Sequence, residues 1–170
     1  MKKNITLIGM PASGKSTVGV LLAKRLGYSF VDTDIVIQEK EGRLLKEIIE
    51  QDGLEGFLKV ENRINSELDV NRSVIAPGGS VIYGKEAMEH LKEISIVIYL
   101  KLRYQDVKAR LGDLKDRGVA LKDGMTLRQL YEERVPYYEK YADITVDETG
   151  KTPGQTVDEL RAMMEELLKQ

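Results

Sequence analysis

The chain has 170 residues, a formal net charge of −2 at pH 7 and no cysteine. This length suits one domain with its own core, and the weak acidic balance gives no global attraction to nucleic acid or to an anionic membrane. No apolar run approaches membrane-spanning length, and residues 1–4 leave no room for a secretory leader before the first apolar run. We therefore expect a cytoplasmic monomer without nucleic-acid or membrane partners, and the absence of cysteine fits a reducing compartment.

Short apolar, β-prone runs alternate with segments of helical periodicity along the chain. The predicted strands are residues 5–8, 28–31, 74–76, 94–100 and 144–146. The predicted helices are residues 15–26, 34–41, 44–52, 54–68, 85–91, 104–111, 127–138 and 156–168. This alternation is typical of an α/β protein with a parallel sheet covered by helices.

Residues 9–17 follow the first predicted strand and read Gly-Met-Pro-Ala-Ser-Gly-Lys-Ser-Thr, a complete Gly-x4-Gly-Lys-[Ser/Thr] phosphate loop. Its glycines let the chain turn off the strand and curl backbone N–H groups around phosphate oxygens, at the positive end of the next helix. Lys15 can reach the terminal phosphates, and the Ser16 hydroxyl can ligate Mg²⁺. The motif predicts a nucleoside triphosphate site formed by Ala12, Ser13, Gly14, Lys15, Ser16 and Thr17.

Two carboxylates follow the second predicted strand, at the edge where open α/β sheets gather their ligands. Asp32 and Asp34 are separated by one residue, so they leave the strand end in different directions and can serve different partners. We assign Asp32 to the Mg²⁺ shell, directly or through water, and Asp34 to the hydroxyl group of an acceptor. The alternative is that Asp34 only caps the following helix.

Residues 112–124 fit neither the strand nor the helix period. The segment is polar, bounded by glycines and long for a connection. Such connections are usually functional or disordered. Beside a phosphate loop, a closing lid is the better interpretation.

Together these features resemble the shikimate kinase family of P-loop proteins, from the first strand to the last helix. The resemblance is carried by the phosphate loop, Leu-Ala-Lys-Arg-Leu-Gly at 22–27, Phe-Val-Asp-Thr-Asp at 30–34, Gly42, Ile48, Phe57 with Glu61, Ile75-Ala76, Gly78-Gly79, Arg110, Arg117, Glu133-Arg134-x-Pro136-x-Tyr138, Ala142-Asp143 and Val146-Asp147. It implies a three-layer sandwich whose five-stranded parallel sheet has the order 2-3-1-4-5. Residues 1–170 would form one kinase domain, with a lid at 112–124 and an acceptor-binding region at 34–70.

The family transfers the γ-phosphoryl group of ATP to a ring hydroxyl of shikimate, with Mg²⁺, in aromatic amino acid biosynthesis. By resemblance, Asp34 would hold the acceptor hydroxyl, with or without deprotonating it, and Glu61, Gly78, Gly79 and Arg134 would complete the acceptor site. Arg117 would reach the transferring phosphoryl group and Arg110 would pack on adenine. The expected catalytic residues are Lys15, Asp34 and Arg117, which fits a reaction that depends on positioning and on neutralising phosphoryl charge.

The arginines have plainer alternatives when the sequence is considered alone. Arg117 lies in a polar loop, where arginines are usually solvated. Arg110 and Arg134 lie on predicted helices, where an exposed ion pair contributes little to stability.

The acceptor side departs from the family pattern at three places. The family's Phe-Arg-x-x-Glu reads Phe-Leu-Lys-Val-Glu at 57–61, so Leu58 replaces the arginine that pairs with the shikimate carboxylate. Lys59 lies about 100° further around the helix, and an ammonium does not reproduce the guanidinium fork. Ser80, preceded by Pro77, Gly78 and Gly79, replaces a third glycine, and residues 117–121 read Arg-Gly-Val-Ala-Leu in place of Arg-Pro-Leu-Leu.

Loss of one partner of a buried charge pair typically costs roughly 2–5 kcal/mol, or about thirty-fold to several thousand-fold in affinity. We therefore predict an ATP-dependent small-molecule kinase with shikimate as the leading acceptor. Alternatives are a different hydroxylated metabolite as acceptor, a nucleotide-binding regulatory protein without acceptor turnover, and a nucleoside monophosphate kinase-like enzyme. Asp34 and Arg134 favour an enzyme over a regulator, because a sensor needs neither, and the short chain argues against the third alternative.

Overall fold

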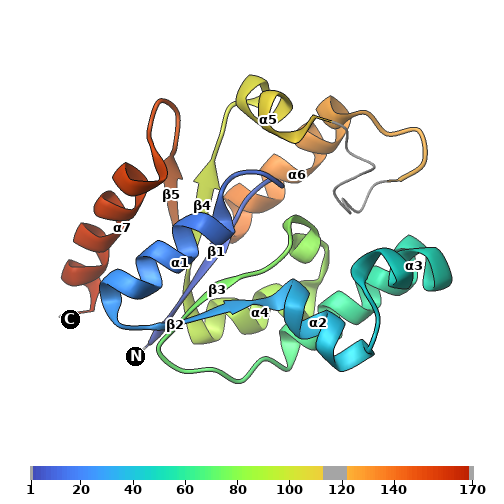
Figure 1. Cartoon of the computed structure of the whole chain (residues 1–170), viewed down its shortest axis with the longest axis horizontal. Helices are drawn as coiled ribbons and strands as arrows, with labels where there is room; N and C mark the ends of the chain where they lie inside the picture. The colour runs from blue at the N-terminus through green and yellow to red at the C-terminus, as the bar shows by residue number, and fades with distance from the viewer. Residues whose placement is uncertain (1, 113–121, 169–170) are drawn as a thin grey trace.

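The structure is a computed structural model that describes residues 2–112 and 122–168. Five strands form one parallel sheet in the order β2-β3-β1-β4-β5 (Figure 1). Their bounds are Asn4–Ile8 for β1, Ser29–Asp32 for β2, Ser73–Ala76 for β3, Ser95–Lys101 for β4 and Ile144–Asp147 for β5. The predicted α/β fold and strand order are confirmed.

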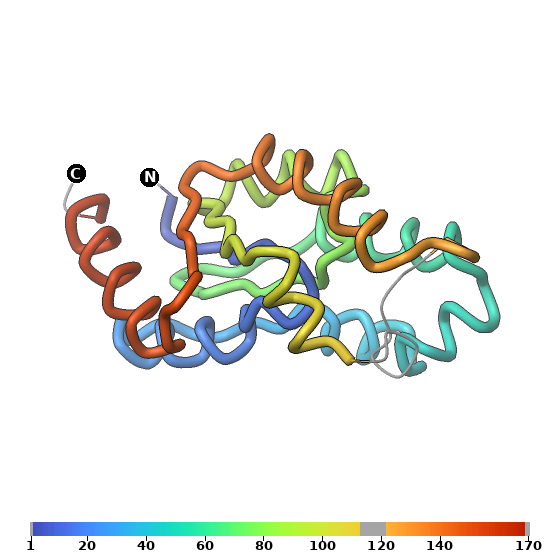
Figure 2. The backbone as a smooth tube through the Cα atoms, turned by 90° about the horizontal axis from the view of Figure 1, so that it is seen from above, coloured from blue at the N-terminus to red at the C-terminus, as the bar shows by residue number. Residues whose placement is uncertain are grey.

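Helices cover both faces of the sheet, which makes three layers (Figure 2). Helices α1 (Lys15–Leu26) and α7 (Pro153–Leu167) pack on one face, and α4 (Lys85–Ile94) and α6 (Leu127–Tyr141) on the other. The remaining elements are α2 (Thr33–Glu41), α3 (Leu45–Ser66), α5 (Tyr104–Leu111) and a 3-10 helix, η1 (Gly79–Tyr83). Helices α2 and α3 form their own small core at the end of the molecule away from α7 and both chain termini (Figure 1).

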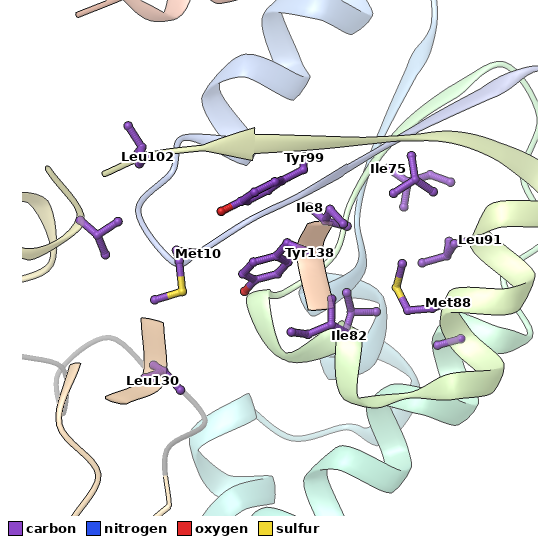
Figure 3. Packing of buried hydrophobic residues seen from close by; sticks show 14 of the residues in the cluster. Ile8, Met10, Ile75, Ile82, Met88, Leu91, Tyr99, Leu102, Leu130 and Tyr138 are labelled. Atoms are coloured by element: carbon purple, nitrogen blue, oxygen red, sulfur yellow. The ribbon is translucent and has the colours of Figure 1, made fainter. Parts of the chain in front are cut away.

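Two buried tyrosines join the sheet to α6. The rings of Tyr99 on β4 and Tyr138 on α6 stack with centroids 5.2 Å apart, and Figure 3 shows Tyr138 between Tyr99 and Ile82 of η1. The Tyr138 hydroxyl donates to the carbonyl of Gly79 over 2.7 Å. The core on this face therefore fixes the segment after β3 relative to α6.

The helix boundaries mostly follow the sequence pattern, and two differences have clear causes. The single span α3 contains Gly53 at φ 73° and ψ 175°, so its backbone leaves the helical region at the residue that separates the two predicted helices. Ile94 was predicted to begin a strand but ends α4, and from the helix its apolar side chain still packs against the core of this face. The short helix η1 was not predicted, since its Gly-Ser-Val-Ile-Tyr sequence has too few residues for helical periodicity.

The predicted lid lies mostly outside the described residues. Residues 113–121, including Arg117, are not described, and only the ends of the segment, residue 112 and residues 122–124, are. The lid therefore stays a prediction. Within residues 2–112 and 122–168, none of the helices has both the length and the apolar character needed to span a membrane.

Candidate active site

The phosphate loop joins β1 to α1 in the conformation that its sequence predicts. A Cβ on Gly9 would lie 2.8 Å from the carbonyl oxygen of Leu100, so the close approach to β4 requires glycine. Ala12 and Gly14 have φ of 66° and 81°, on either side of Ser13, whose N–H donates to the Met10 carbonyl over 3.1 Å. Alternation of left-handed and other conformations turns successive N–H groups toward one concavity, an arrangement that suits an anion.

Lys15 lies over this loop. Its Nζ donates to the carbonyl oxygens of Gly9 and Met10, at 2.9 Å each. Burial lowers the pKa of Lys15 to about 8, and the nearby carboxylate of Asp34 opposes that change. Lys15, at the start of α1, is therefore held by two backbone carbonyls, and the charge of Asp34 acts on it.

The two carboxylates after β2 have different partners. Asp32 is the N-cap of α2, and its Oδ1 accepts from the N–H of Asp34 over 3.0 Å. The alternative that Asp34 caps this helix is therefore wrong, because Asp32 does so. Burial, and to a lesser extent Asp32, raise the pKa of Asp34 to about 6, and Lys15 opposes the rise.

A cavity of about 290 Å³ lies between the phosphate loop, the end of β2, α3, the segment after β3 and α6. It is lined by Pro11, Ala12, Gly14, Lys15, Ser16, Thr17, Asp32, Asp34, Leu45, Phe57, Glu61, Ala76, Pro77, Gly78, Gly79, Ser80 and Arg134. The structure thus brings together the predicted phosphate, metal and acceptor residues except Ser13, Arg110 and Arg117. Ser13 belongs to the loop but is fully buried, and Arg117 lies outside the described residues.

The floor of the cavity after β3 is built from glycines. A Cβ on Gly78 would lie 2.9 Å from Asp34 Oδ1 and 3.2 Å from Glu61 Oε2, and one on Gly79 would lie 3.0 Å from Arg134 Nη1. The first of these distances is shorter than Cβ atoms normally show, and the other two are unusually tight. The absence of side chains here therefore lets three charged or ionisable groups converge.

Arg134 enters the cavity from α6 and is 1% exposed. Its guanidinium lies 5.5 Å from the centroid of the Tyr83 ring, and its Nε donates to the Tyr83 hydroxyl over 3.4 Å. That hydroxyl donates to Glu133 Oε2 over 2.6 Å. The alternative of an exposed ion pair is therefore wrong for Arg134. Tyr83, which orients the guanidinium, carries no sequence signal that could have identified it.

Glu61 faces the same cavity from α3 and is 2% exposed. The Ser80 hydroxyl contacts both of its carboxyl oxygens, at 2.7 and 2.9 Å, and burial raises the pKa of Glu61 to about 8. Leu58, one turn before Glu61, is not part of this cavity wall. It lines a second cavity of about 190 Å³ with Leu54, Tyr83, Lys122, Met125, Leu130 and Glu133.

Arg110 lies outside the cavity, against the back of the phosphate loop. It is exposed on α5, and its Nη1 donates to the Ala12 carbonyl over 3.2 Å. Near it, Glu148 follows β5 and is 5% exposed. Burial raises the pKa of Glu148 to about 7, while Arg110, Lys15 and Lys151 oppose the rise. No sequence signal marks Glu148, because a single glutamate after a strand forms no motif.

A phosphate loop after the first strand, carboxylates after the second and a shared cavity at the carboxyl edge of a 2-3-1-4-5 sheet define a small P-loop phosphotransferase. The family model described as shikimate kinase matches residues 11–165. This chain belongs to the shikimate kinase family.

Individual relatives agree with this assignment over nearly the whole chain. A shikimate kinase of Persephonella marina is 36% identical over 159 residues, which cover 93% of this chain and 96% of that protein. The structure of shikimate kinase from Acinetobacter baumannii in complex with shikimate is similar with a TM-score of 0.84 and 31% identity, and covers 99% of this chain and 94% of that one. The Aquifex aeolicus shikimate kinase structure has a TM-score of 0.80 and 34% identity, with 95% and 96% of the two chains covered.

Proposed function

We propose that this protein is a kinase that transfers the γ-phosphoryl group of ATP to a ring hydroxyl of shikimate, giving shikimate 3-phosphate and ADP. The observation that carries the proposal is that the phosphate loop with Lys15 shares one cavity with Asp34, Glu61 and Arg134. The A. baumannii relative, whose structure contains shikimate, supports this acceptor. The relatives argue against the regulatory and nucleotide-acceptor alternatives.

The donor half of the site fits ATP and Mg²⁺. Backbone N–H groups at the start of α1 and the Lys15 ammonium suit the β- and γ-phosphates. The Ser16 hydroxyl and the Asp32 carboxylate line the cavity beside Lys15, and both are oxygen ligands of the kind that Mg²⁺ prefers. When bound there, the metal neutralises charge on the phosphate oxygens. Arg110, against the loop, is our candidate for packing on adenine, and Arg117 for contacting the transferring phosphoryl group.

The acceptor half positions the nucleophile. The oxygen of the acceptor hydroxyl forms a bond to the γ-phosphorus, and Asp34 accepts the proton of that hydroxyl. The bond between the γ-phosphorus and the β–γ bridging oxygen breaks, and ADP leaves. With a pKa of about 6, Asp34 is largely ionised at neutral pH and can take that proton. Arg134, buried and oriented by Tyr83, provides a guanidinium for the shikimate carboxylate.

An assay of ADP release tests the proposal. We expect shikimate, but not a panel of other hydroxy acids, amino alcohols and sugars, to raise turnover well above background ATP hydrolysis. Chelation of divalent metal should abolish that turnover, and added Mg²⁺ should restore it. Turnover that no acceptor stimulates would instead favour the regulatory alternative.

We also infer that the protein acts as a cytoplasmic monomer on ATP and a small-molecule acceptor, without a nucleic-acid or membrane partner. The weak net charge of −2 and the absence of cysteine support this inference. Size-exclusion chromatography with light scattering should give a mass near the 19.2 kDa of one chain.

A further inference from the structure

The carboxyl group of Glu61 has a serine hydroxyl as its hydrogen-bond partner inside the acceptor cavity. The Ser80 Oγ lies 2.7 Å from Oε1 and 2.9 Å from Oε2 of Glu61, and both residues line the cavity wall. Leu58, the neighbour one turn earlier on α3, has an apolar side chain that lies along the second cavity. Glu61 therefore has a hydroxyl partner in a cavity that lacks the carboxylate-binding arginine of the family pattern, because Leu58 stands at that position.

Several charged groups face Glu61 across the cavity. Asp34 approaches from α2, close enough that one Cβ on Gly78 would touch both carboxyl groups. Arg134 faces it from α6, and Lys15 from the start of α1. Leu45 and Phe57 add apolar surface, which disfavours an ionised carboxylate. Burial has the largest effect on the ionisation of Glu61, and it is modified by a balance between Asp34, which favours the neutral form, and Ser80 and Arg134, which favour the ionised form.

Arrival of a carboxylate in this cavity changes that balance. An acceptor carboxylate bound by Arg134 adds a negative charge and also shares the positive charge that favours ionised Glu61. Both effects favour the neutral form of Glu61. A neutral carboxylic acid also provides an O–H donor, which an ionised glutamate lacks.

We propose that Glu61, held by Ser80, determines the affinity of this protein for its acceptor, and that a carboxylate-bearing acceptor binds together with a proton that Glu61 retains. This inference rests on the proposed function, because it takes shikimate as the acceptor. Protonated Glu61, hydrogen-bonded to Ser80, then accommodates the negative charge of the acceptor carboxylate. The arginine that Leu58 replaces would otherwise have this role.

The expected pH dependence follows from linkage. Glu61 has a pKa raised to about 8 in the acceptor-free protein, so its neutral form predominates below that pH and is lost as the pH rises through it. If only the protein with neutral Glu61 binds well, the dissociation constant of shikimate rises about ten-fold between pH 7 and pH 9. In the same range, binding takes up protons from solution.

Titration calorimetry of shikimate binding without nucleotide, from pH 6.5 to pH 9.5 and in buffers of different ionisation enthalpy, measures both quantities. We expect the parent protein to show the ten-fold loss of affinity and the proton uptake. Glu61→Gln keeps the shape of the side chain but cannot ionise, so it should lack the part of both effects that comes from Glu61. Lys15 has a pKa lowered to about 8 and contributes to titration in both proteins. The difference between parent and variant therefore isolates Glu61.

Two further variants separate this role from a structural one. Ser80→Ala removes a hydrogen bond that favours ionised Glu61, so the midpoint of the affinity loss should move to higher pH. The matched control Glu89→Gln, on an exposed glutamate paired with Lys85, should keep the parent profile. Thermal unfolding establishes whether each variant is folded. If Glu61→Gln does not fold, the pH profile of Ser80→Ala still tests the proposal.

The outcomes separate the two proposals. Shikimate binding with equal proton uptake and equal pH dependence in parent and Glu61→Gln overturns the role of Glu61 and leaves the kinase function intact. A midpoint that Ser80→Ala does not raise also overturns it. No shikimate binding at any pH, together with no shikimate-dependent ADP release, overturns the proposed function as well.

Discussion

The Tyr138 hydroxyl donates a 2.7 Å hydrogen bond to the Gly79 carbonyl, which joins α6 to the glycine segment of the acceptor cavity. Arg134 lies one turn before Tyr138 on the same helix. This contact therefore sets the distance between two parts of the acceptor site.

Tyr138→Phe should keep the stacked ring and lose this hydrogen bond. Such a loss typically costs about 0.5–1.5 kcal/mol, which corresponds to a fall in Tm of about 2–4 °C per kcal/mol for a chain of this size. We expect a larger rise in the KM for shikimate than in the KM for ATP. Differential scanning calorimetry and steady-state kinetics measure the two effects, and equal changes in both KM values would contradict the expected link to the acceptor side.

Asp34→Asn should remove the proton acceptor and leave the phosphate loop unchanged. We expect kcat to fall by about 10²- to 10⁴-fold, with ATP affinity nearly unchanged in an equilibrium binding assay. Lys15→Ala is the complementary variant, because it should impair nucleotide binding or phosphoryl transfer. A wild-type kcat for Asp34→Asn would remove Asp34 from the mechanism.

The pH dependence of turnover provides a separate test of Asp34. Its pKa is raised to about 6, and the ionised form is the one that accepts a proton. Since kcat/KM reports the pKa values of the free enzyme, kcat/KM for shikimate should fall as the pH drops through about 6. The acidic limb should be absent from the residual activity of Asp34→Asn, and its persistence would assign it to another group.

Gly78→Ala should damage the site by steric contact alone. The backbone of Gly78, at φ −61° and ψ 158°, is accessible to alanine, but the added Cβ would lie 2.9 Å from Asp34 Oδ1. We expect a lower kcat/KM for shikimate and a small change in Tm. Gly154→Ala is the matched control, because its Cβ would have no neighbour closer than 3.9 Å. A drop in Tm with normal kinetics would indicate a structural role for Gly78.

Leu58→Arg should lower the KM for shikimate and leave the KM for ATP unchanged, since a guanidinium binds a carboxylate through two parallel hydrogen bonds. Leu58→Lys, which has charge without the fork, should give a smaller gain. An unchanged KM in Leu58→Arg would mean that the side chain stays in the second cavity beside Tyr83 and Met125.

The donor half of the site could be predicted from local sequence, because backbone geometry at Gly9 and Gly14 and the helix that begins at Lys15 make the phosphate site from neighbouring residues. The sheet order was available only through the family resemblance. The Glu61–Ser80 contact could not be predicted, although Ser80 was recognised as a departure. This contact joins α3 to η1, so it depends on how α3 is rotated about its axis. That rotation follows from the break at Gly53 and from tertiary packing.

The tertiary structure is also needed to decide whether a substituted position on a helix lies in the acceptor site or beside it. Leu58 replaces the carboxylate-binding arginine of the family pattern in the sequence, and its side chain lies in the adjacent cavity. Asp32 and Asp34 were expected to serve different partners. Asp32 caps α2, whereas the sequence had suggested Asp34 as the alternative cap.

The contacts of Lys15 with Gly9 and Met10 mean that the phosphate loop keeps its shape through its own lysine. An incoming triphosphate then exchanges two carbonyl partners of one ammonium for phosphate oxygens, and the backbone need not reorganise. Since ordering a loop weakens binding by the conformational entropy that is lost, a phosphate loop that already has its shape without nucleotide adds little to that loss.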